Sequence, residues 1–315
     1  MIPDYNSNIV YLSPLLEKCH KQVYEDLTKI LRKNDVAYDL IPRTKNIWCR
    51  DYMPLQLTED CFLSYKYRPD YLIKNKIDKE YISDTKEICL YMKLNFKTTS
   101  LIIDGGNIVK AGNKVIMTEK VFAENSNISE KWLKQKIRKH LDCEVIFIPW
   151  DKNEKYGHSD GILKPIDDET ILLTNYQDFD NEYYEEIKRK LSKKFRVETL
   201  QYNVKNKDSR NWSYINFLTV GNLIVLPQLG IEEDSHAFEQ IKQFYPNYNI
   251  EKLNIVPIIK KGGRLNCITW CRLTNPVLER FLIEYNSFKH EGHLKTTEKI
   301  KILLMKKLTF YAKTI

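Results

Sequence analysis

A pattern of apolar residues that recurs about every 50 positions constrains the fold of this chain more than any other feature of its sequence. Five stretches show the helical spacing of apolar residues, at about 14–33, 77–93, 128–141, 180–193 and 232–245. Short runs rich in β-branched residues follow them and begin at Val36, Leu94, Cys143, Phe195 and Ile250. Their length and composition predict strands. A helix and a strand repeated at this interval indicate an array of similar α/β units.

Each predicted strand is followed by a polar or glycine-containing junction, usually with two further strand-like runs beyond it. Turn-forming residues separate these two runs at 58–60, 111–113, 167–169 and 221–222. The fifth unit lacks a return strand before Asn275-Pro276, but the chain begins with an isolated strand-like run at 8–12. If this run completes the fifth hairpin, it covers a sheet edge that would otherwise be exposed. We therefore predict an α/β fold, a five-bladed α/β propeller with pseudo-five-fold repeats that is closed by the N-terminal strand.

The repeat ends near residue 275, which predicts one domain over 1–275 and a C-terminal extension over 276–315 that packs on the same domain. The stretch from Lys299 mixes lysine with apolar residues, which is typical of a terminal helix or strand against the ring. A membrane-surface helix is the alternative for this stretch.

Charge and cysteine content exclude several classes of partner. The formal net charge of +8 is spread along the chain, and without a zinc-finger or RNA-recognition signature we expect no nucleic-acid binding. The 7 cysteines lack paired spacing and the first residues lack a signal-peptide pattern, so we expect reduced thiols and a cytoplasmic location. No apolar run approaches the roughly 20 residues of a spanning helix, so we expect no membrane insertion. A homo-oligomer stays open.

Chemically versatile residues gather in the five junctions, which occupy the same place in each unit. In a ring, these junctions point to one end of the central axis, so their side chains converge. Taken alone, a histidine or a cysteine is more often part of the core than of a site. Together the junctions hold three carboxylates, an imidazole, a carboxamide and a thiol, from Asp51, Asp104, His158, Asp160, Asn216 and Cys267. Chance is the poorer explanation for this set, which predicts a shared site.

These junctions resemble the motifs of the agmatine deiminases and bacterial-type peptidylarginine deiminases, members of the guanidino-group-modifying pentein superfamily. Over about residues 1–275 the motifs occur in family order and spacing, as Trp48-x-Arg50-Asp51, Asp104-Gly105-Gly106, Gly157-His158-x-Asp160, Tyr214-x-Asn216-Phe217 and Gly262-Gly263-x-x-x-Cys267. The resemblance implies a pentein catalytic domain and a role in polyamine biosynthesis. Asp104 replaces the family's usual Glu, and Asn266 stands where agmatine deiminases usually have His.

The resemblance also implies a role for each junction residue. Cys267 would be the nucleophile and His158 its acid/base partner, while Asp51 and Asp160 match the positions that grip a guanidinium through paired N–H bonds. The further residues expected at the substrate are Asp104, Trp48, Asn216 and Arg264, and Asp104 could also orient His158. Thiolate attack, loss of ammonia and hydrolysis of a thiouronium intermediate would convert agmatine to N-carbamoylputrescine. We expect this chemistry to need no metal or cofactor.

Several alternatives stay open at this point. The guanidine substrate could be free arginine or peptidyl-arginine, which would give citrulline, or the same thiol could serve an amidinotransferase. A catalytically dead propeller that acts as a binding scaffold is the non-enzyme alternative. Arg264 bears on the choice of substrate, because an outward side chain leaves agmatine preferred and an inward one would match a substrate carboxylate. We expect the outward orientation.

Overall fold

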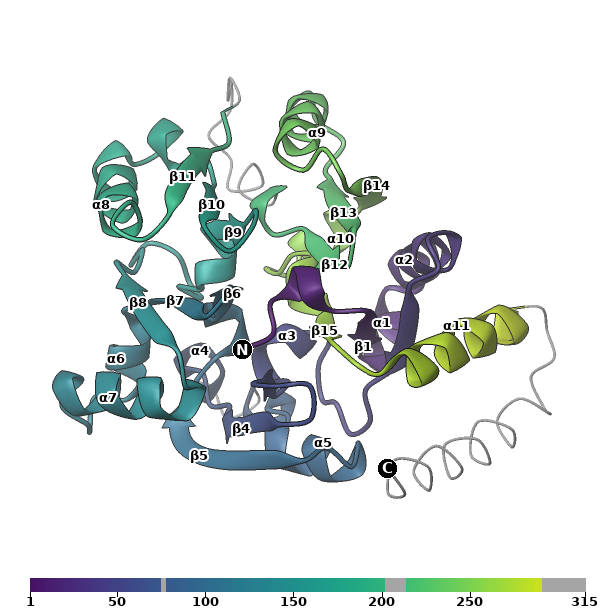
Figure 1. Ribbon diagram of the computed structural model, residues 1–315, viewed down its shortest axis with the longest axis horizontal. Helices are drawn as coiled ribbons and strands as arrows, with labels where there is room; N and C mark the ends of the chain where they lie inside the picture. The colour runs from purple at the N-terminus through teal and green to yellow at the C-terminus, as the bar shows by residue number, and fades with distance from the viewer. Residues whose placement is uncertain (75–77, 202–213, 291–315) are drawn as a thin grey trace.

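The computed structural model describes residues 1–74, 78–201 and 214–290, and within them the strands form five separate three-stranded sheets (Figure 1). The strands are β1 (Ile9–Leu12), β2 (Ala37–Leu40), β3 (Leu55–Gln56), β4 (Phe62–Lys66), β5 (Phe96–Ile102), β6 (Val109–Ala111), β7 (Lys114–Thr118), β8 (Glu144–Ile148), β9 (Leu163–Pro165), β10 (Thr170–Leu173), β11 (Arg196–Thr199), β12 (Leu218–Val220), β13 (Leu223–Gln228), β14 (Asn249–Asn254) and β15 (Trp270–Arg272). The helices are α1 (Pro14–Cys19), α2 (Lys21–Lys33), α3 (Cys49–Tyr52), α4 (Asp70–Ile73), α5 (Thr85–Tyr91), α6 (Lys120–Glu124), α7 (Glu130–Leu141), α8 (Asn181–Leu191), α9 (Glu233–Phe244), α10 (Val256–Ile259) and α11 (Pro276–His290). The expected α/β class is observed.

All five sheets have the same topology. Two strands form an antiparallel pair, and after one or more helices a third strand returns parallel to the central strand of the sheet. In one sheet β6 pairs antiparallel with β7, and β8 then runs parallel to β7 with Val115 opposite Val145. The intervening α7 buries Leu133, Ile137 and Leu141, which lie four residues apart on one face. The recurring sequence pattern therefore corresponds to one recurring structural unit.

The N-terminal strand completes the fifth sheet, as the isolated run at 8–12 predicted. β1 pairs antiparallel with β15, with Ile9 opposite Arg272 and Tyr11 opposite Trp270. On its other edge β1 pairs parallel with β2. Figure 1 shows the five sheets around a common centre, with α2, α5, α7, α8 and α9 further out. No continuous sheet runs through the described residues, because each group of three strands stays separate.

Several predicted boundaries were wrong, for local reasons. The helix expected over 77–93 is shorter, because Asp84 caps α5 by accepting hydrogen bonds from the backbone N–H groups of Lys86 and Glu87. The strand expected from Ile250 gives way to α10 after β14, and proline suits the first turn of a helix because it lacks an N–H.

The described part of the C-terminal extension is α11, which lies beside β2. Leu282 and Tyr285 are buried, and Asn286 Nδ2 donates a hydrogen bond to the Tyr38 carbonyl at 2.8 Å. The stretch from Lys299 falls outside the described residues, and the division at residue 275 stays a prediction. Among the described helices, none has the length and apolar character needed to cross a bilayer.

The polar junctions fold as short helical turns that end just before the first strand of each hairpin. These turns are α3, η3 (Gly105–Asn107), η4 (Ser159–Gly161), residues 214–216 and η7 (Asn266–Ile268). α3 contacts both η3 and η7, and η3 contacts η4. The repeat therefore brings residues that are far apart in the sequence to one place.

Candidate active site

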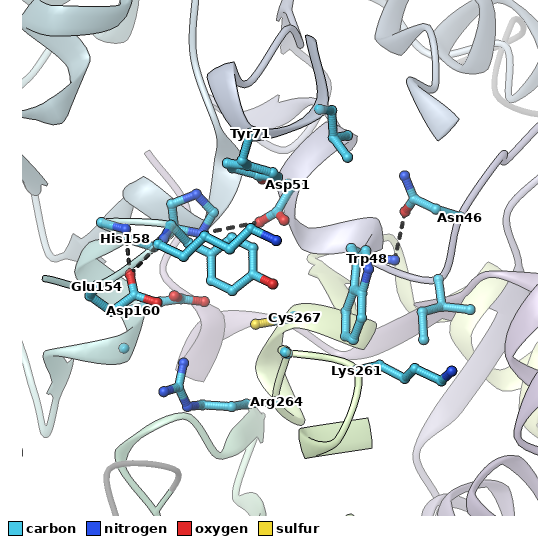
Figure 2. Close-up of a pocket in the computed structure, with 18 of the residues that line it drawn as sticks. Asn46, Trp48, Asp51, Tyr71, Glu154, His158, Asp160, Lys261, Arg264 and Cys267 are labelled. Atoms are coloured by element: carbon cyan, nitrogen blue, oxygen red, sulfur yellow. Dashed lines mark hydrogen bonds and ion pairs between the residues drawn. The ribbon is translucent and has the colours of Figure 1, made fainter. Parts of the chain in front are cut away.

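Three of these junction turns open onto one cavity of about 560 Å³ (Figure 2). Asp51, His158, Asp160 and Cys267 all line it. In Figure 2 the Cys267 sulfur lies between the Trp48 ring on one side and the acidic residues with His158 on the other. The cavity thus presents the Cys267 thiol, the His158 imidazole and the Asp51 and Asp160 carboxylates to a single ligand, and Asp151 and Glu154 line it as well.

Cys267 is nearly inaccessible, with 8% of its surface exposed. Its Sγ lies 3.6 Å from Asn216 Oδ1, close enough for a weak S–H hydrogen bond to the amide oxygen. Burial raises the pKa of this thiol well above its usual value, and the Asp160 and Asp51 carboxylates raise it further, against the effect of Arg264. Without a cationic ligand, the residue is therefore held as a neutral thiol.

His158 lies between two carboxylates. Its Nε2 lies 3.0 Å from Asp104 Oδ2, and its Nδ1 lies 3.6 Å from Asp51 Oδ1. Burial alone would lower the pKa of the imidazole, but Asp51 and Asp104 together raise that pKa to about 9. The ring is therefore protonated at neutral pH, and it can donate a proton.

Among the carboxylates of the cavity, Asp51 and Asp160 have different surroundings. Burial raises the pKa of Asp51 to about 7; His158 lowers this pKa, while Asp104 and Asp160 raise it. Asp160 Oδ2 accepts a hydrogen bond from Asn266 Nδ2 at 2.8 Å. The Asp160 backbone carbonyl accepts another from Asn216 Nδ2 at 2.9 Å. Asp160 is thus held by two amides, whereas Asp51 Oδ1 is buried without a hydrogen bond from the described residues.

Two motif positions require glycine, because side chains of the cavity lie very close to the backbone there. A Cβ on Gly106 would lie 2.5 Å from His158 Nδ1 and 2.6 Å from Asp51 Oδ1. A Cβ on Gly263 would lie 2.0 Å from the Trp48 ring. Real Cβ atoms do not come this close to other heavy atoms, so any side chain at either position would displace a residue of the cavity.

The other predicted residues divide between the cavity and its support. Trp48 and Arg264 line the cavity. We had expected Arg264 to point outward, but it forms part of the cavity wall. Asp104 and Asn216 do not line it. Asp104 lies behind His158, and Asn216 bonds to the Asp160 backbone and approaches Cys267. Among the described residues, no group of three or more His, Cys, Asp and Glu side chains is arranged to hold a metal ion.

Lys120 and Tyr71 belong to the site but were not predicted. Lys120 is buried, with its Nζ 3.8 Å from Asp104 Oδ2 and 3.1 Å from Glu124 Oε1. The Tyr71 ring lines the cavity and packs edge-on against Tyr156, with ring centroids 5.0 Å apart. Neither residue lies in a junction, so the position within the repeat gave no signal for them.

Comparison with solved structures defines the class of fold. The chain matches the agmatine deiminase of Enterococcus faecalis with a TM-score of 0.70 at 17% identity, covering 87% of this chain and 95% of that one. It matches a candidate arginine deiminase of Porphyromonas gingivalis with a TM-score of 0.68 at 15% identity, covering 86% and 97%. The fold is thus the α/β fold of the pentein superfamily.

Sequence comparison identifies the family within that class. Residues 8–271 match the Porphyromonas-type peptidyl-arginine deiminase family, and the chain belongs to it. A curated protein of Lactococcus lactis named as a candidate agmatine deiminase is 23% identical over 214 residues, which cover 56% of this chain and 58% of that protein. A similarly named protein of Legionella pneumophila is 27% identical over 200 residues, covering 57% and 58%. The aligned part thus spans under two thirds of the length of these relatives.

Proposed function

We propose that this protein is a cysteine-dependent guanidine deiminase built as a five-bladed α/β propeller. The observation that carries the proposal is the shared cavity, in which buried Cys267 meets protonated His158 and the carboxylates of Asp51 and Asp160. Two carboxylates beside a thiol suit a planar cation with N–H groups on several sides. The relatives named for agmatine support this compound as the first substrate to test, with N-carbamoylputrescine as product. A cytoplasmic location and a role in polyamine biosynthesis belong to the same proposal.

Substrate binding itself would activate the nucleophile. In the free site, burial and the Asp160 and Asp51 carboxylates raise the pKa of Cys267. A bound guanidinium offsets the charge of both carboxylates, so the Cys267 thiol loses its proton to solvent, and forms the thiolate, only when the carbon it attacks is present. Protonated His158 adds a second positive charge near the thiolate.

The reaction then proceeds in two steps. The thiolate forms an S–C bond to the guanidinium carbon while one C–N bond breaks, and His158 gives its proton to the departing ammonia. Neutral His158 next takes a proton from water, whose oxygen adds to the thiouronium carbon and displaces the Cys267 thiolate. The second proton of that water goes to solvent. Guanidinium and water are thereby converted to the ureido product, ammonia and one proton.

A panel of guanidine compounds, scored for both ammonia and ureido product, tests the proposal. Release of the two in equal amounts from a single guanidine is the expected result. Ammonia-free transfer to an added amine would instead identify an amidinotransferase. Absence of any turnover, with Cys267 no more reactive than the other cysteines toward iodoacetamide, would support the binding scaffold.

One observation favours a second substrate, free arginine or peptidyl-arginine. Arg264 lines the cavity, and no carboxylate of the described residues forms an ion pair with it. Lys45 and Lys261 line the same cavity and are exposed. A substrate carboxylate would be matched by these cations, while Asp151 and Glu154, which line the same cavity, could match an amine.

A further inference from the structure

A second, much smaller cavity of about 20 Å³ is lined by buried charges, and Asp160 and Asn266 form part of its wall. Asp160 is shared with the large cavity, so this carboxylate stands between the two. The small cavity is also lined by three basic side chains, those of Arg50, Lys110 and Lys164. None of the three is more than 8% exposed.

Asp4, in the short turn η1 (Asp4–Asn6), pairs with two of these cations. Its Oδ2 lies 2.9 Å from Arg50 Nη2, and its Oδ1 lies 3.0 Å from Lys110 Nζ. Lys164 instead donates hydrogen bonds to the Phe217 carbonyl at 2.8 Å and to Asn266 Oδ1 at 3.0 Å. Three cations and two carboxylates, those of Asp4 and Asp160, therefore lie around the small cavity.

Asn266 lies between this cluster and Asp160. Its Oδ1 accepts hydrogen bonds from Arg50 Nη2 at 3.1 Å and from Lys164 Nζ at 3.0 Å. Two cationic donors fix the amide oxygen on their side, because the alternative orientation would turn an NH₂ group toward them. The Asn266 Nδ2 must then face the other way, where it donates to Asp160 Oδ2 at 2.8 Å.

A neutral amide has a particular advantage at this position. A direct ion pair of Arg50 or Lys164 with Asp160 would occupy the carboxylate and offset the negative charge needed for a guanidinium. The Asn266 amide instead fixes the orientation of the Asp160 carboxylate through one hydrogen bond. The other carboxylate oxygen, Asp160 Oδ1, then remains for the ligand. In a low-dielectric interior such a chain of hydrogen bonds is also strengthened by the cations at its end.

We propose that Asn266 is a positioning residue, which keeps buried cations from pairing with Asp160 and holds that carboxylate ready for a cationic substrate. This inference rests on the proposed function, since it concerns the carboxylate that grips the guanidinium. It assigns to Asn266 and Lys164 a role in the selectivity of the site for cations, although neither side chain lines the large cavity.

The test compares two alkylating reagents of the same shape, cationic 2-chloroacetamidine and neutral 2-chloroacetamide. Mass spectrometry follows the rate at which each reagent alkylates Cys267. The ratio of the two rates is divided by the same ratio for a small free thiol. This corrected ratio measures how strongly the carboxylates favour a cationic reagent, and it needs no turnover. Wild-type protein should prefer the amidinium reagent. Equal corrected rates in the wild type would overturn the proposed grip itself, and with it the function proposed above.

Asn266→Leu keeps the side-chain size and removes both sets of hydrogen bonds, so the amidinium preference should fall about tenfold or more. Lys164→Met leaves Arg50 to orient the amide, so the fall should be smaller, about threefold. Thr219→Val is the matched control, because Thr219 lines the small cavity and its Oγ1 has no hydrogen-bond partner among the described residues. Its ratio should equal that of the wild type. An unchanged ratio in Asn266→Leu, or in Lys164→Met if the first variant does not fold, would overturn the role of Asn266.

Discussion

His158 Nε2 lies 3.0 Å from Asp104 Oδ2, while the opposite nitrogen of the ring faces Asp51 at 3.6 Å. The two carboxylates thus stabilise the imidazolium from both sides, and they raise the pKa of His158 to about 9. Asp51, with a pKa raised to about 7, must lose its proton to bind a cation. The dependence of kcat/KM on pH should therefore be bell-shaped, with an acidic limb near 7 and a basic limb near 9.

Asp104→Asn should move the basic limb of this profile to lower pH by about one unit or more, because one of the two charges that raise the pKa of His158 is lost. As the pH rises, His158 of this variant loses its proton earlier, so the activity that needs protonated His158 is lost at a lower pH. Asp104→Glu retains the charge and serves as control. An unmoved basic limb in the asparagine variant would show that another group titrates there.

Cys267→Ala should abolish turnover while the thermal unfolding temperature changes little, because Cys267 is the cavity thiol whose pKa responds to the Asp160 and Asp51 carboxylates. Cys271→Ala is the control, since Cys271 lies on β15 opposite Val10 and outside the cavity. Ammonia release should persist in that variant. Activity above a few per cent in Cys267→Ala would refute the assignment of Cys267 as the nucleophile.

Asp51→Asn and Asp160→Asn should each lower kcat/KM. The fall should correspond to a loss of about 2–4 kcal/mol of transition-state stabilisation, as expected when one partner of a buried charged contact is removed. Steady-state kinetics on the best substrate of the panel measures this. Near-normal kinetics in either variant would mean that another carboxylate grips the guanidinium.

Unfolding separates this loss of activity from a loss of structure. Burial raises the folded-state pKa of Asp51 to about 7, above the ordinary value of about 3.9. The folded state then holds a proton that the unfolded chain releases, so the contribution of Asp51 to stability falls as the pH rises between these two values. Asp51→Asn should accordingly raise Tm at pH 8 relative to the wild type, with little difference near pH 4. A lower Tm at pH 8 would contradict the electrostatic picture.

Arg264→Ala should lower kcat/KM for arginine by about tenfold or more, roughly 1.4 kcal/mol, while the value for agmatine changes little. The reason is that Arg264 lines the cavity without an ion pair to a described carboxylate, so a substrate carboxylate has a partner there. Lys193→Ala, which removes an exposed cation outside the cavity, is the control for general loss of positive charge. An unchanged ratio of the two substrates would leave agmatine preferred.

The repeat could be predicted from the sequence because hydrophobic periodicity reflects which side of each helix and strand is buried. Leu133, Ile137 and Leu141 show this in α7. The same periodicity predicted that Asp51, His158, Asp160 and Cys267 would converge, since equivalent positions in similar units face the same way. These are properties of a single unit repeated, and one sequence suffices to see them.

Other features depend on contacts between units, which periodicity does not encode. Lys120 is the first residue of α6 and carries no sequence signal, but tertiary packing places its amine near Asp104. Arg264 follows a turn in which Gly262 has a φ of +91°. That conformation is open to glycine and cannot be read from its neighbours.

The pairing of β1 with β15 also bears on the order in which the protein is made. The ribosome releases β1 first, but its antiparallel partner follows only after most of the chain has been synthesised. Until then one edge of β1 has no partner from this sheet, and the final pairing closes a very long loop, which slows folding. A nascent chain interrupted before Trp270 would expose that edge to other chains, so premature termination should lead to aggregation rather than to a smaller stable protein.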